Sequence, residues 1–332
     1  MKERLLQELE QIKEAGNYRE IRYLKPVNAS RVRYEGREYL NLCSNSYLSL
    51  HLHPDVIRAA KDATDEYGAG TCSSRSVSGS IDLYARLEDE VASFKGYEKA
   101  LIFSNGYLAN IGIIATLAGA RDVIFSDELN HSSIIDSTRL SGAHRVIYRH
   151  LDVEDLEKKI RRESARTKTS KKFIITETVF SMDGDIAPLG PLWELCRRHD
   201  GLLYIDDAHA TGVIGSGKGA LAHFGISLEP RIVQMGTFSK ALGSYGAFVA
   251  GSREVIDWLT STARTFMFST ALPACVMAAS LKALGLIEAG HDSYRRLWTN
   301  HRRLLQGLAE ISGKIGSCLC ASSDAGSPSE VN

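Results

Sequence analysis

The stretch GLLYIDDAHATGVIG, residues 201–215, decides the fold class of this chain. A short apolar run ends there at an acidic pair, Asp206 and Asp207, and a connection containing glycine follows. Runs of the same kind recur as KALIFS (99–104), DVIFS (122–126), HRVIYR (144–149), KFIITE (172–177), RIVQMG (231–236) and GAFVAG (246–251). Segments with helical periodicity separate them, and this alternation predicts an α/β fold with a mostly parallel central sheet and helices on both faces.

The ends of these apolar runs hold the candidate functional residues, because ligands of open α/β sheets bind beyond the carboxyl ends of the strands. The candidates after the earlier runs lie in residues 105–107, 127–131 and 178–183. Two later runs lead into Asp206, Asp207 and His209, and into Thr237, Ser239 and Lys240. We therefore expect one binding site, assembled along one edge of the sheet.

Composition favours a globular protein that binds a small molecule. The 332 residues are 44% hydrophobic, and 40 basic residues balance 40 acidic ones with which they are interleaved. Such a balance gives no broad basic surface for nucleic acid or for an anionic membrane. The length suggests about two domains. We place an N-terminal helical arm at residues 1–40, a large domain at 41–285 and the start of a small C-terminal domain at 286–332.

The N-terminal segment MKERLLQELEQIKEAG predicts an amphipathic helix that serves as a docking arm, with apolar residues at positions 5, 6, 9 and 12. It lacks the apolar centre of a secretory leader, and no later stretch is long enough to span a bilayer. The six cysteines include no CxxC pair, which predicts reduced thiols. Together these features predict a cytoplasmic protein.

Asp206 and Lys240 follow two of the apolar runs, which places an acid and an amine at the same sheet edge. This pair suits pyridoxal 5′-phosphate (PLP). A carboxylate beside the pyridine nitrogen keeps that nitrogen protonated, and a lysine amine holds the aldehyde as a Schiff base. His209, three residues after Asp206, is within reach of the phenolic oxygen of the same ring.

Other residues at the same edge suit the remaining parts of this cofactor. Gly106 and Tyr107 open a helix after an apolar run, and the positive end of a helix binds phosphate. Thr237 and Ser239 add hydroxyl donors beside the lysine. His131 offers an imidazole that could stack on the ring and assist proton movement. The hydroxyl of Ser181 completes this group as a further polar contact.

Each residue taken alone also has a structural explanation, because acids and histidines after strands commonly cap helices and most lysines are solvated. GVIGSGK (212–218) fits the GxxxxGK part of a phosphate-binding P-loop, but Gly219 stands where that motif needs serine or threonine. We therefore favour a structural role for this run. His51 and His53, before Pro54, predict the start of a helix rather than a metal site.

Four ordered motifs carry a family resemblance: SDELNHSSIID (126–136), ETVFSMDGD (177–185), DDAHATGVIG (206–215) and GTFSKALGSYGAFVAG (236–251). They resemble the α-oxoamine synthases, PLP enzymes of fold type I that condense an amino acid with an acyl thioester and release carbon dioxide. The resemblance covers residues 15 to 310 approximately. Within the family, DDAHATGV and FSNGYLAN (103–110) favour the reaction of L-alanine with a pimeloyl thioester, carried by coenzyme A or an acyl carrier protein.

The resemblance implies roles for individual residues. Lys240 is the Schiff-base lysine, Asp206 lies at the pyridine nitrogen, His209 at the phenolic oxygen, and His131 stacks on the ring. The residues implied to complete cofactor binding are Gly106, Tyr107, Ser181 and Thr237. Substrate binding is implied for Asn45 and, on a looser match, for Arg19. Ser269 and Thr270 match a segment that reaches the phosphate of a neighbouring subunit, which implies a homodimer with shared active sites.

The C-terminal region departs from the family pattern. Family members continue into a complete small domain, with an arginine for the amino-acid carboxylate, whereas residues 316–332, GSCLCASSDAGSPSEVN, read as a disordered tail. We therefore expect a truncated C-terminal domain. Three rival functions stay open: aminotransfer on the same scaffold, an inactive PLP-binding remnant, and a P-loop nucleotide binder.

Overall fold

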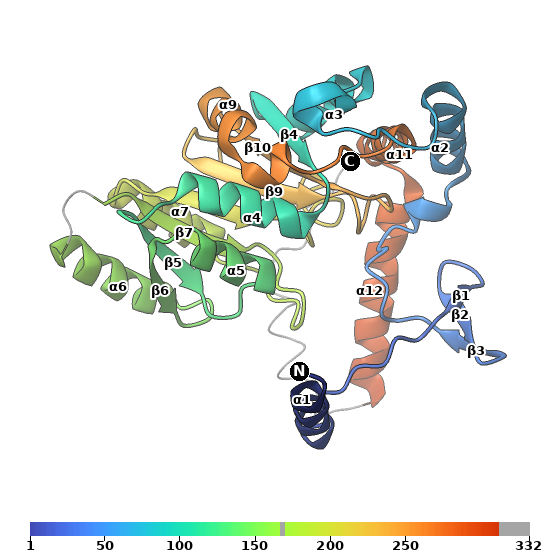
Figure 1. Ribbon diagram of the computed structural model, residues 1–332, viewed down its shortest axis with the longest axis horizontal. Coiled ribbons are helices and arrows are strands. Elements are labelled where there is room, and N and C mark those ends of the chain that lie inside the picture. Colours follow the sequence, from blue (N-terminus) through green and yellow to red (C-terminus); the bar gives the residue numbers. More distant parts are fainter. Residues whose placement is uncertain (167–169, 312–332) are drawn as a thin grey trace. The chain divides into compact units, whose positions relative to one another are not determined.

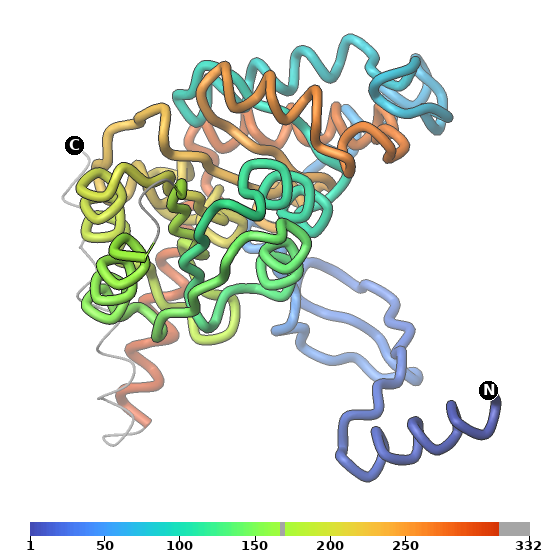
Figure 2. The backbone as a smooth tube through the Cα atoms, turned by 60° about the vertical axis from the view of Figure 1, so that its left-hand side comes forward, coloured from blue at the N-terminus to red at the C-terminus, as the bar shows by residue number. Residues whose placement is uncertain are grey.

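The computed structural model describes residues 1–166 and 170–311, and the chain divides into two compact units, Met1–Ser44 and Asn45–Asn332. The first unit begins with α1 (Lys2–Glu14), which buries no residue of its own. Three strands follow in one antiparallel sheet, β1 (Lys25–Pro26), β2 (Arg31–Tyr34) and β3 (Arg37–Leu40), drawn in blue in Figure 2. The expected helical arm over 1–40 is thus helical only at its start.

The hairpin between β2 and β3 has a local cause in the sequence. Glu35 and Gly36 form its two-residue turn, with φ of 48° and 77°. Positive φ at both central positions is the mark of a type I′ turn, whose twist matches that of the flanking strands. The turn therefore fixes the register of this pair.

A seven-stranded sheet forms the centre of the second unit, in the order β4-β10-β9-β8-β7-β5-β6 (Figure 1). The strands are β4 (Lys99–Phe103), β5 (Val123–Asp127), β6 (His144–Tyr148), β7 (Lys172–Glu177), β8 (Leu202–Asp206), β9 (Ile232–Thr237) and β10 (Ala247–Gly251). β5 to β9 pair in parallel, whereas β10 is antiparallel to both of its neighbours, β9 and β4. The predicted α/β fold with a mostly parallel sheet is confirmed.

Helices cover both faces of this sheet (Figure 1). One face packs on α4 (Gly106–Leu117), α5 (Ser132–Leu140), α9 (Arg253–Thr262) and α10 (Arg264–Met267). The other face packs on α6 (Val153–Arg166), α7 (Leu189–Arg198) and α8 (Ala220–His223), and beside them on α2 (Pro54–Tyr67), α3 (Asp82–Lys95) and α11 (Ala274–Glu288). Both faces of the strands are buried, which explains why the strands read as continuous apolar runs.

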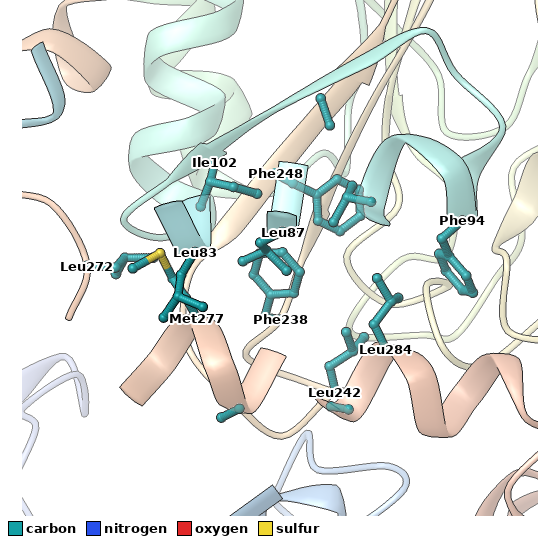
Figure 3. Packing of buried hydrophobic residues seen from close by; sticks show 14 of the residues in the cluster. Leu83, Leu87, Phe94, Ile102, Phe238, Leu242, Phe248, Leu272, Met277 and Leu284 are labelled. Atoms are coloured by element: carbon teal, nitrogen blue, oxygen red, sulfur yellow. The ribbon is translucent and has the colours of Figure 1, made fainter. Parts of the chain in front are cut away.

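The cluster between α3, α11 and the sheet also holds the turn that carries Lys240. Figure 3 shows Phe238 and Leu242 among the packed side chains of Leu83, Leu87, Phe94, Ile102, Phe248, Leu272, Met277 and Leu284. Phe238 and Leu242 are fully buried and lie two residues before and after Lys240. Hydrophobic packing on both sides of the lysine therefore fixes its backbone.

The last described element is α12 (Asp292–Ile311), a long amphipathic helix. Trp298 ties it to the connection after β8, because its indole Nε1–H donates to the Val213 carbonyl at 3.0 Å. The expected disordered tail falls outside the described residues. In the described part of the chain, no helix is long and apolar enough to cross a membrane.

Candidate active site

The carboxyl ends of the parallel strands bring the predicted residues together. Glu177 and Asp206 are register partners at the ends of β7 and β8, and Asp206 is opposite Met235 of β9. The turn between β9 and β10 carries Lys240 to the same edge. Lys240 shifts the pKa of Asp206, Glu177 and His209 by its charge, and His131 acts on Asp206 and His209 in the same way. These residues therefore form one electrostatic cluster.

Lys240 lies in a closed turn. Gly243 N–H donates to the Lys240 carbonyl at 3.0 Å, and Ser244 N–H donates to the Phe238 carbonyl at 2.9 Å. Gly243 has φ +66°, and a Cβ there would come within 2.3 Å of the backbone nitrogen of His51, so only glycine fits. Burial lowers the pKa of the Lys240 amine, although Asp206 and Glu177 oppose this shift. The amine is thus poised to lose its proton and act as a nucleophile.

Asp206 is buried at the end of β8. Its Oδ2 accepts a hydrogen bond from Asn110 Nδ2 at 2.9 Å and its Oδ1 accepts one from the Ala208 backbone at 3.0 Å. Burial raises the pKa of this carboxyl, and the charge of Lys240 opposes the shift. An ionised carboxylate can accept about four hydrogen bonds, so this one retains capacity for a cationic N–H group.

His209 lies on the turn after β8, beside Tyr47. Its Nδ1 is 2.7 Å from Tyr47 Oη, and the single hydrogen of this phenol can go to that nitrogen or to Asn45 Oδ1, 3.3 Å away. Burial lowers the pKa of His209 to about 4, and the charges of Lys240 and His131 act in the same direction. The imidazole is therefore neutral at physiological pH. Asn45 is linked to the cluster through Tyr47, a residue that the sequence analysis did not select.

His131 caps α5. Its Nδ1 accepts a hydrogen bond from the Ser133 backbone at 3.2 Å and lies 2.8 Å from Ser133 Oγ. The ring itself is exposed. His131 is thus a helix cap, the structural role expected of a histidine after a strand. Its exposure also leaves room for a cofactor to stack on the ring.

Glu177 belongs to the same cluster and was missed by sequence reasoning. Burial raises the pKa of Glu177 to about 8, and the charge of Asp206 adds to this shift. A hydrogen bond from the His131 backbone acts in the opposite direction. Its acid is therefore protonated at neutral pH. The available signal was an acid that ends the apolar run KFIITE, the position that Asp206 holds in GLLYID.

The residues expected to bind phosphate occupy several places. Gly106 and Tyr107 open α4, where Asn105 Oδ1 caps the helix by accepting from Leu108 N–H at 2.9 Å. The hydroxyl of Thr237 is used inside the turn, since it donates to the Gly246 carbonyl at 2.8 Å and lies 2.7 Å from Ser239 Oγ. Because the Thr237 hydrogen goes to Gly246, Ser239 Oγ is the donor in its contact with Thr237, and the exposed Ser239 side chain is held in the same turn.

The structure does not bring every candidate into the cluster. Ser181 is exposed on the turn after β7, which is closed by the bridge between Val179 and Ile186. Thr270 is exposed and bridges Ser74, next to Ser269. Arg19 belongs to the first unit, Met1–Ser44, whereas the cluster belongs to the second.

The P-loop interpretation of residues 212–218 fails on the backbone. A P-loop leaves its N–H groups free for phosphate, but here Gly217 and Gly219 donate to the Ile214 carbonyl, both at 3.0 Å, and Lys218 to Gly215 at 3.0 Å. The loop instead encloses a buried ion pair, in which Lys95 Nζ is 3.0 Å from Asp207 Oδ2. Lys95 also donates to the Lys218 carbonyl at 2.7 Å. The run is structural, as the sequence favoured.

The donor set fits PLP. A half-buried lysine amine with a lowered pKa, a buried carboxylate with unused acceptor capacity and a neutral imidazole meet at one edge of the sheet. Among the described residues no group of three or more histidine, cysteine or acidic side chains could hold a metal ion. The cluster thus has the chemistry for a pyridine ring with an aldehyde.

Comparisons with known sequences agree with this chemistry. A family model described as aminotransferase class I and II matches residues 37–326. The 8-amino-7-oxononanoate synthase of Exiguobacterium sibiricum is 43% identical over 318 residues, which are 95% of this chain and 80% of the relative. The enzyme of the same name from Geobacter sulfurreducens is 48% identical over 293 residues, covering 87% of this chain and 74% of the relative.

Solved structures give the same result. The serine palmitoyltransferase of Sphingomonas wittichii superposes with a TM-score of 0.85 at 34% identity, covering 93% of this chain and 77% of that one. The serine palmitoyltransferase of S. paucimobilis, solved with a bound PLP–myriocin adduct, has a TM-score of 0.84 at 31% identity over 93% of this chain and 80% of that one. The chain therefore belongs to the aminotransferase class I and II family and, within it, to the α-oxoamine synthases, PLP-dependent acyltransferases of fold type I.

Proposed function

We propose that the chain condenses L-alanine with a pimeloyl thioester, carried by coenzyme A or by an acyl carrier protein. The products are 8-amino-7-oxononanoate, carbon dioxide and the free thiol, in biotin biosynthesis. The observation that carries this proposal is the cluster of Lys240, Asp206, His209 and His131 at one sheet edge, in a chain 43% and 48% identical to two synthases of that name.

PLP, when bound, supplies an electron sink for the negative charge left on Cα of the amino acid. Lys240 Nζ would hold the cofactor, and the same nitrogen, when free, would accept the Cα proton of the amino acid. The lowered pKa of this amine favours the neutral, proton-accepting form. Asp206 would keep a proton on the pyridine nitrogen, and the charge of that nitrogen would in turn favour the ionised carboxylate.

The remaining residues orient the reactants. The neutral His209 would offer its Nε2–H to the phenolic oxygen, with Nδ1 accepting the hydrogen of Tyr47 Oη, 2.7 Å away. His131 would stack on the ring and help to orient the substrate carboxylate. Gly106, Tyr107, Ser181 and Thr237 bind the rest of the cofactor. Asn45 and Arg19 bind substrate.

We also propose a homodimer with shared active sites, in the cytoplasm. Thr270, with Ser269 beside it, reaches the cofactor phosphate of the neighbouring subunit. The exposed position of Thr270 in the single chain supports this assignment.

A second α-oxoamine synthase reaction is favoured by one observation, the TM-score of 0.85 with a serine palmitoyltransferase. It replaces L-alanine by L-serine and the pimeloyl group by a longer acyl chain. Reactions of glycine, which give 2-amino-3-ketobutyrate or 5-aminolevulinate, are the other members of this alternative. All of them release the thiol. The reaction that gives 2-amino-3-ketobutyrate keeps all four carbons of glycine and the acetyl group, so it alone releases no carbon dioxide, and the identity of the amino-ketone product separates the others.

The test begins with absorption spectra of purified protein supplied with PLP, before and after borohydride reduction. We expect a visible band that borohydride removes, with the label on Lys240. Lys240→Ala abolishes the band, and the matched control Lys218→Ala, an exposed lysine of the same sheet edge, keeps it. A wild-type protein that stays colourless with excess PLP contradicts the proposal, and protection by ATP instead would support a nucleotide binder.

Product analysis then separates the reactions. With L-alanine and pimeloyl-coenzyme A we expect one carbon dioxide and one free thiol for each amino ketone formed. Glycine and L-serine serve as competing substrates. Formation of pyridoxamine phosphate without carbon dioxide supports aminotransfer, and a stable PLP band without turnover supports an inactive binding protein.

A further inference from the structure

One buried asparagine links the two ends of the candidate site. Asn110 lies on α4 and is 1% exposed. Its Nδ2 donates to Asp206 Oδ2 at 2.9 Å and to Ser133 Oγ at 2.8 Å. Its Oδ1 accepts from Tyr204 Oη at 2.5 Å. The full hydrogen-bonding capacity of the NH₂ group is therefore spent on the residues beside the proposed cofactor ring.

The orientation of the amide follows from its partners. An ionised Asp206 can only accept, so the NH₂ group faces it. Tyr204 is fully buried, and burial, followed by the charge of Asp206, raises its pKa far above the usual value. The phenol therefore keeps its proton and needs an acceptor, which is Asn110 Oδ1. Tyr204 therefore requires this orientation of the side chain on its own, and an ionised Asp206 requires the same one.

The same reasoning extends to His131. Ser133 Oγ accepts from Asn110, so its own hydrogen is available for His131 Nδ1, 2.8 Å away. The Ser133 backbone N–H also donates to this nitrogen, at 3.2 Å. A nitrogen that receives two donors carries no proton. A neutral His131 ring therefore has its proton on Nε2.

We propose that Asn110 is a positioning residue, which holds the Asp206 carboxylate with one N–H and, with the other, sets Ser133 to fix His131 as the Nε2–H tautomer. The inference rests on the proposed function, because Asp206 and His131 act on the reaction only through PLP. It assigns the acid at the pyridine nitrogen and the stacked imidazole to one hydrogen-bonded chain. A role limited to packing α4 against α5 and β8 is the alternative to be excluded.

The first experiment measures the tautomer of His131 by ¹⁵N NMR in cofactor-free protein with labelled histidine, assigned by difference from His131→Gln. We expect an unprotonated Nδ1 and a protonated Nε2 in the wild type. Ser133→Ala removes the hydroxyl donor and is expected to give a mixture of tautomers. The matched control is Ser137→Ala, a buried serine on the same helix whose hydroxyl bonds the Ser133 carbonyl. It should leave the His131 signals unchanged.

The second experiment measures PLP affinity. Asn110→Ala removes a hydrogen bond to a charged group, and we expect the Kd for PLP to rise by about 10-fold to 100-fold. Asn110→Asp places an oxygen opposite Asp206 and should weaken binding at least as much. Urea unfolding of each variant shows that the protein is folded under the binding conditions.

Three results would overturn the inference: a wild-type Nδ1–H tautomer, equal effects of Ser133→Ala and Ser137→Ala on His131, or unchanged PLP affinity in a folded Asn110→Ala. If the wild type binds no PLP, the proposed function fails. The tautomer experiment uses no cofactor and still decides the role of the hydrogen-bonded chain.

Discussion

Replacement of Lys95 by methionine should strongly destabilise the protein. Lys95 and Asp207 have side chains 1% and 0% exposed, and Nζ lies 3.0 Å from Oδ2. Nζ also donates to Thr211 Oγ1 at 2.8 Å and to the Lys218 carbonyl at 2.7 Å. Burial lowers the pKa of Lys95 in spite of Asp207, so desolvation outweighs the attraction between the two charges. The pair itself then adds little to the stability of the folded protein, but an Asp207 left buried without a partner lowers that stability strongly.

The magnitude follows from this loss. Removing one partner of a buried pair costs about 3–5 kcal/mol, whereas a whole domain is stable by about 5–15 kcal/mol. With an m-value of roughly 3 kcal/mol/M, the urea midpoint should fall by about 1 M or more. Far-ultraviolet circular dichroism during urea titration measures the shift.

Two controls isolate the buried charge. Lys99→Met breaks the exposed pair with Asp257, whose side chains are 39% and 54% exposed, and should cost less than about 1 kcal/mol. Asp207→Asn combined with Lys95→Met removes the unpaired charge and should recover part of the loss. The reasoning is refuted if Lys95→Met destabilises the protein no more than Lys99→Met does.

Three further perturbations test the candidate site. Glu177, with its pKa raised to about 8, keeps its proton in the folded state while the unfolded chain loses it above about pH 4.3. Folding is therefore penalised as pH rises from about 4.5 to about 8, by about 1.4 kcal/mol per unit. Glu177→Gln should gain stability over cofactor-free wild type across this range. The same difference in urea midpoint between variant and wild type at pH 5 and at pH 8 would contradict this expectation. Tyr47→Phe removes the hydroxyl 2.7 Å from His209 Nδ1, so PLP should bind about 5-fold more weakly, as fluorescence titration can measure; unchanged affinity would show that this contact does not orient the ring. Gly243→Ala forces φ +66° on alanine and a contact of 2.3 Å with the His51 backbone, so it should cost about 1–3 kcal/mol and weaken the PLP band. A variant with wild-type stability and absorbance would disprove that the turn is tightly fixed.

The sequence predicts the central sheet well because burial on both faces leaves a direct mark. All seven apolar runs coincide with strands, KALIFS with β4 (Lys99–Phe103) and GAFVAG with β10 (Ala247–Gly251) among them. The small sheet at residues 25–40 was missed, since its strands are short and mostly exposed and leave no apolar run.

Residues that act through distant partners are harder to predict. Lys95 meets Asp207 across 112 positions of sequence, and no local pattern distinguishes it from a solvated lysine at the end of a helix. Asn110 could have been predicted, because it lies four positions after Gly106 on the same helix and therefore on the same face as that candidate. Glu177 ends β7 opposite Asp206 of β8, so its position can be read from the sequence, but its burial and its raised pKa depend on the neighbouring strand.

The turn between β9 and β10 has a consequence for how cofactor is taken up. Its backbone is closed by Phe238 N–H donating to Gly246 at 3.0 Å, and its side chains at 238 and 242 are inserted into the core. Such a segment has little freedom left to lose when a ligand arrives. The hydrogen-bonded amides of Phe238, Gly243 and Ser244 should therefore exchange slowly even before PLP is added, so that the cofactor binds to a turn that is already ordered.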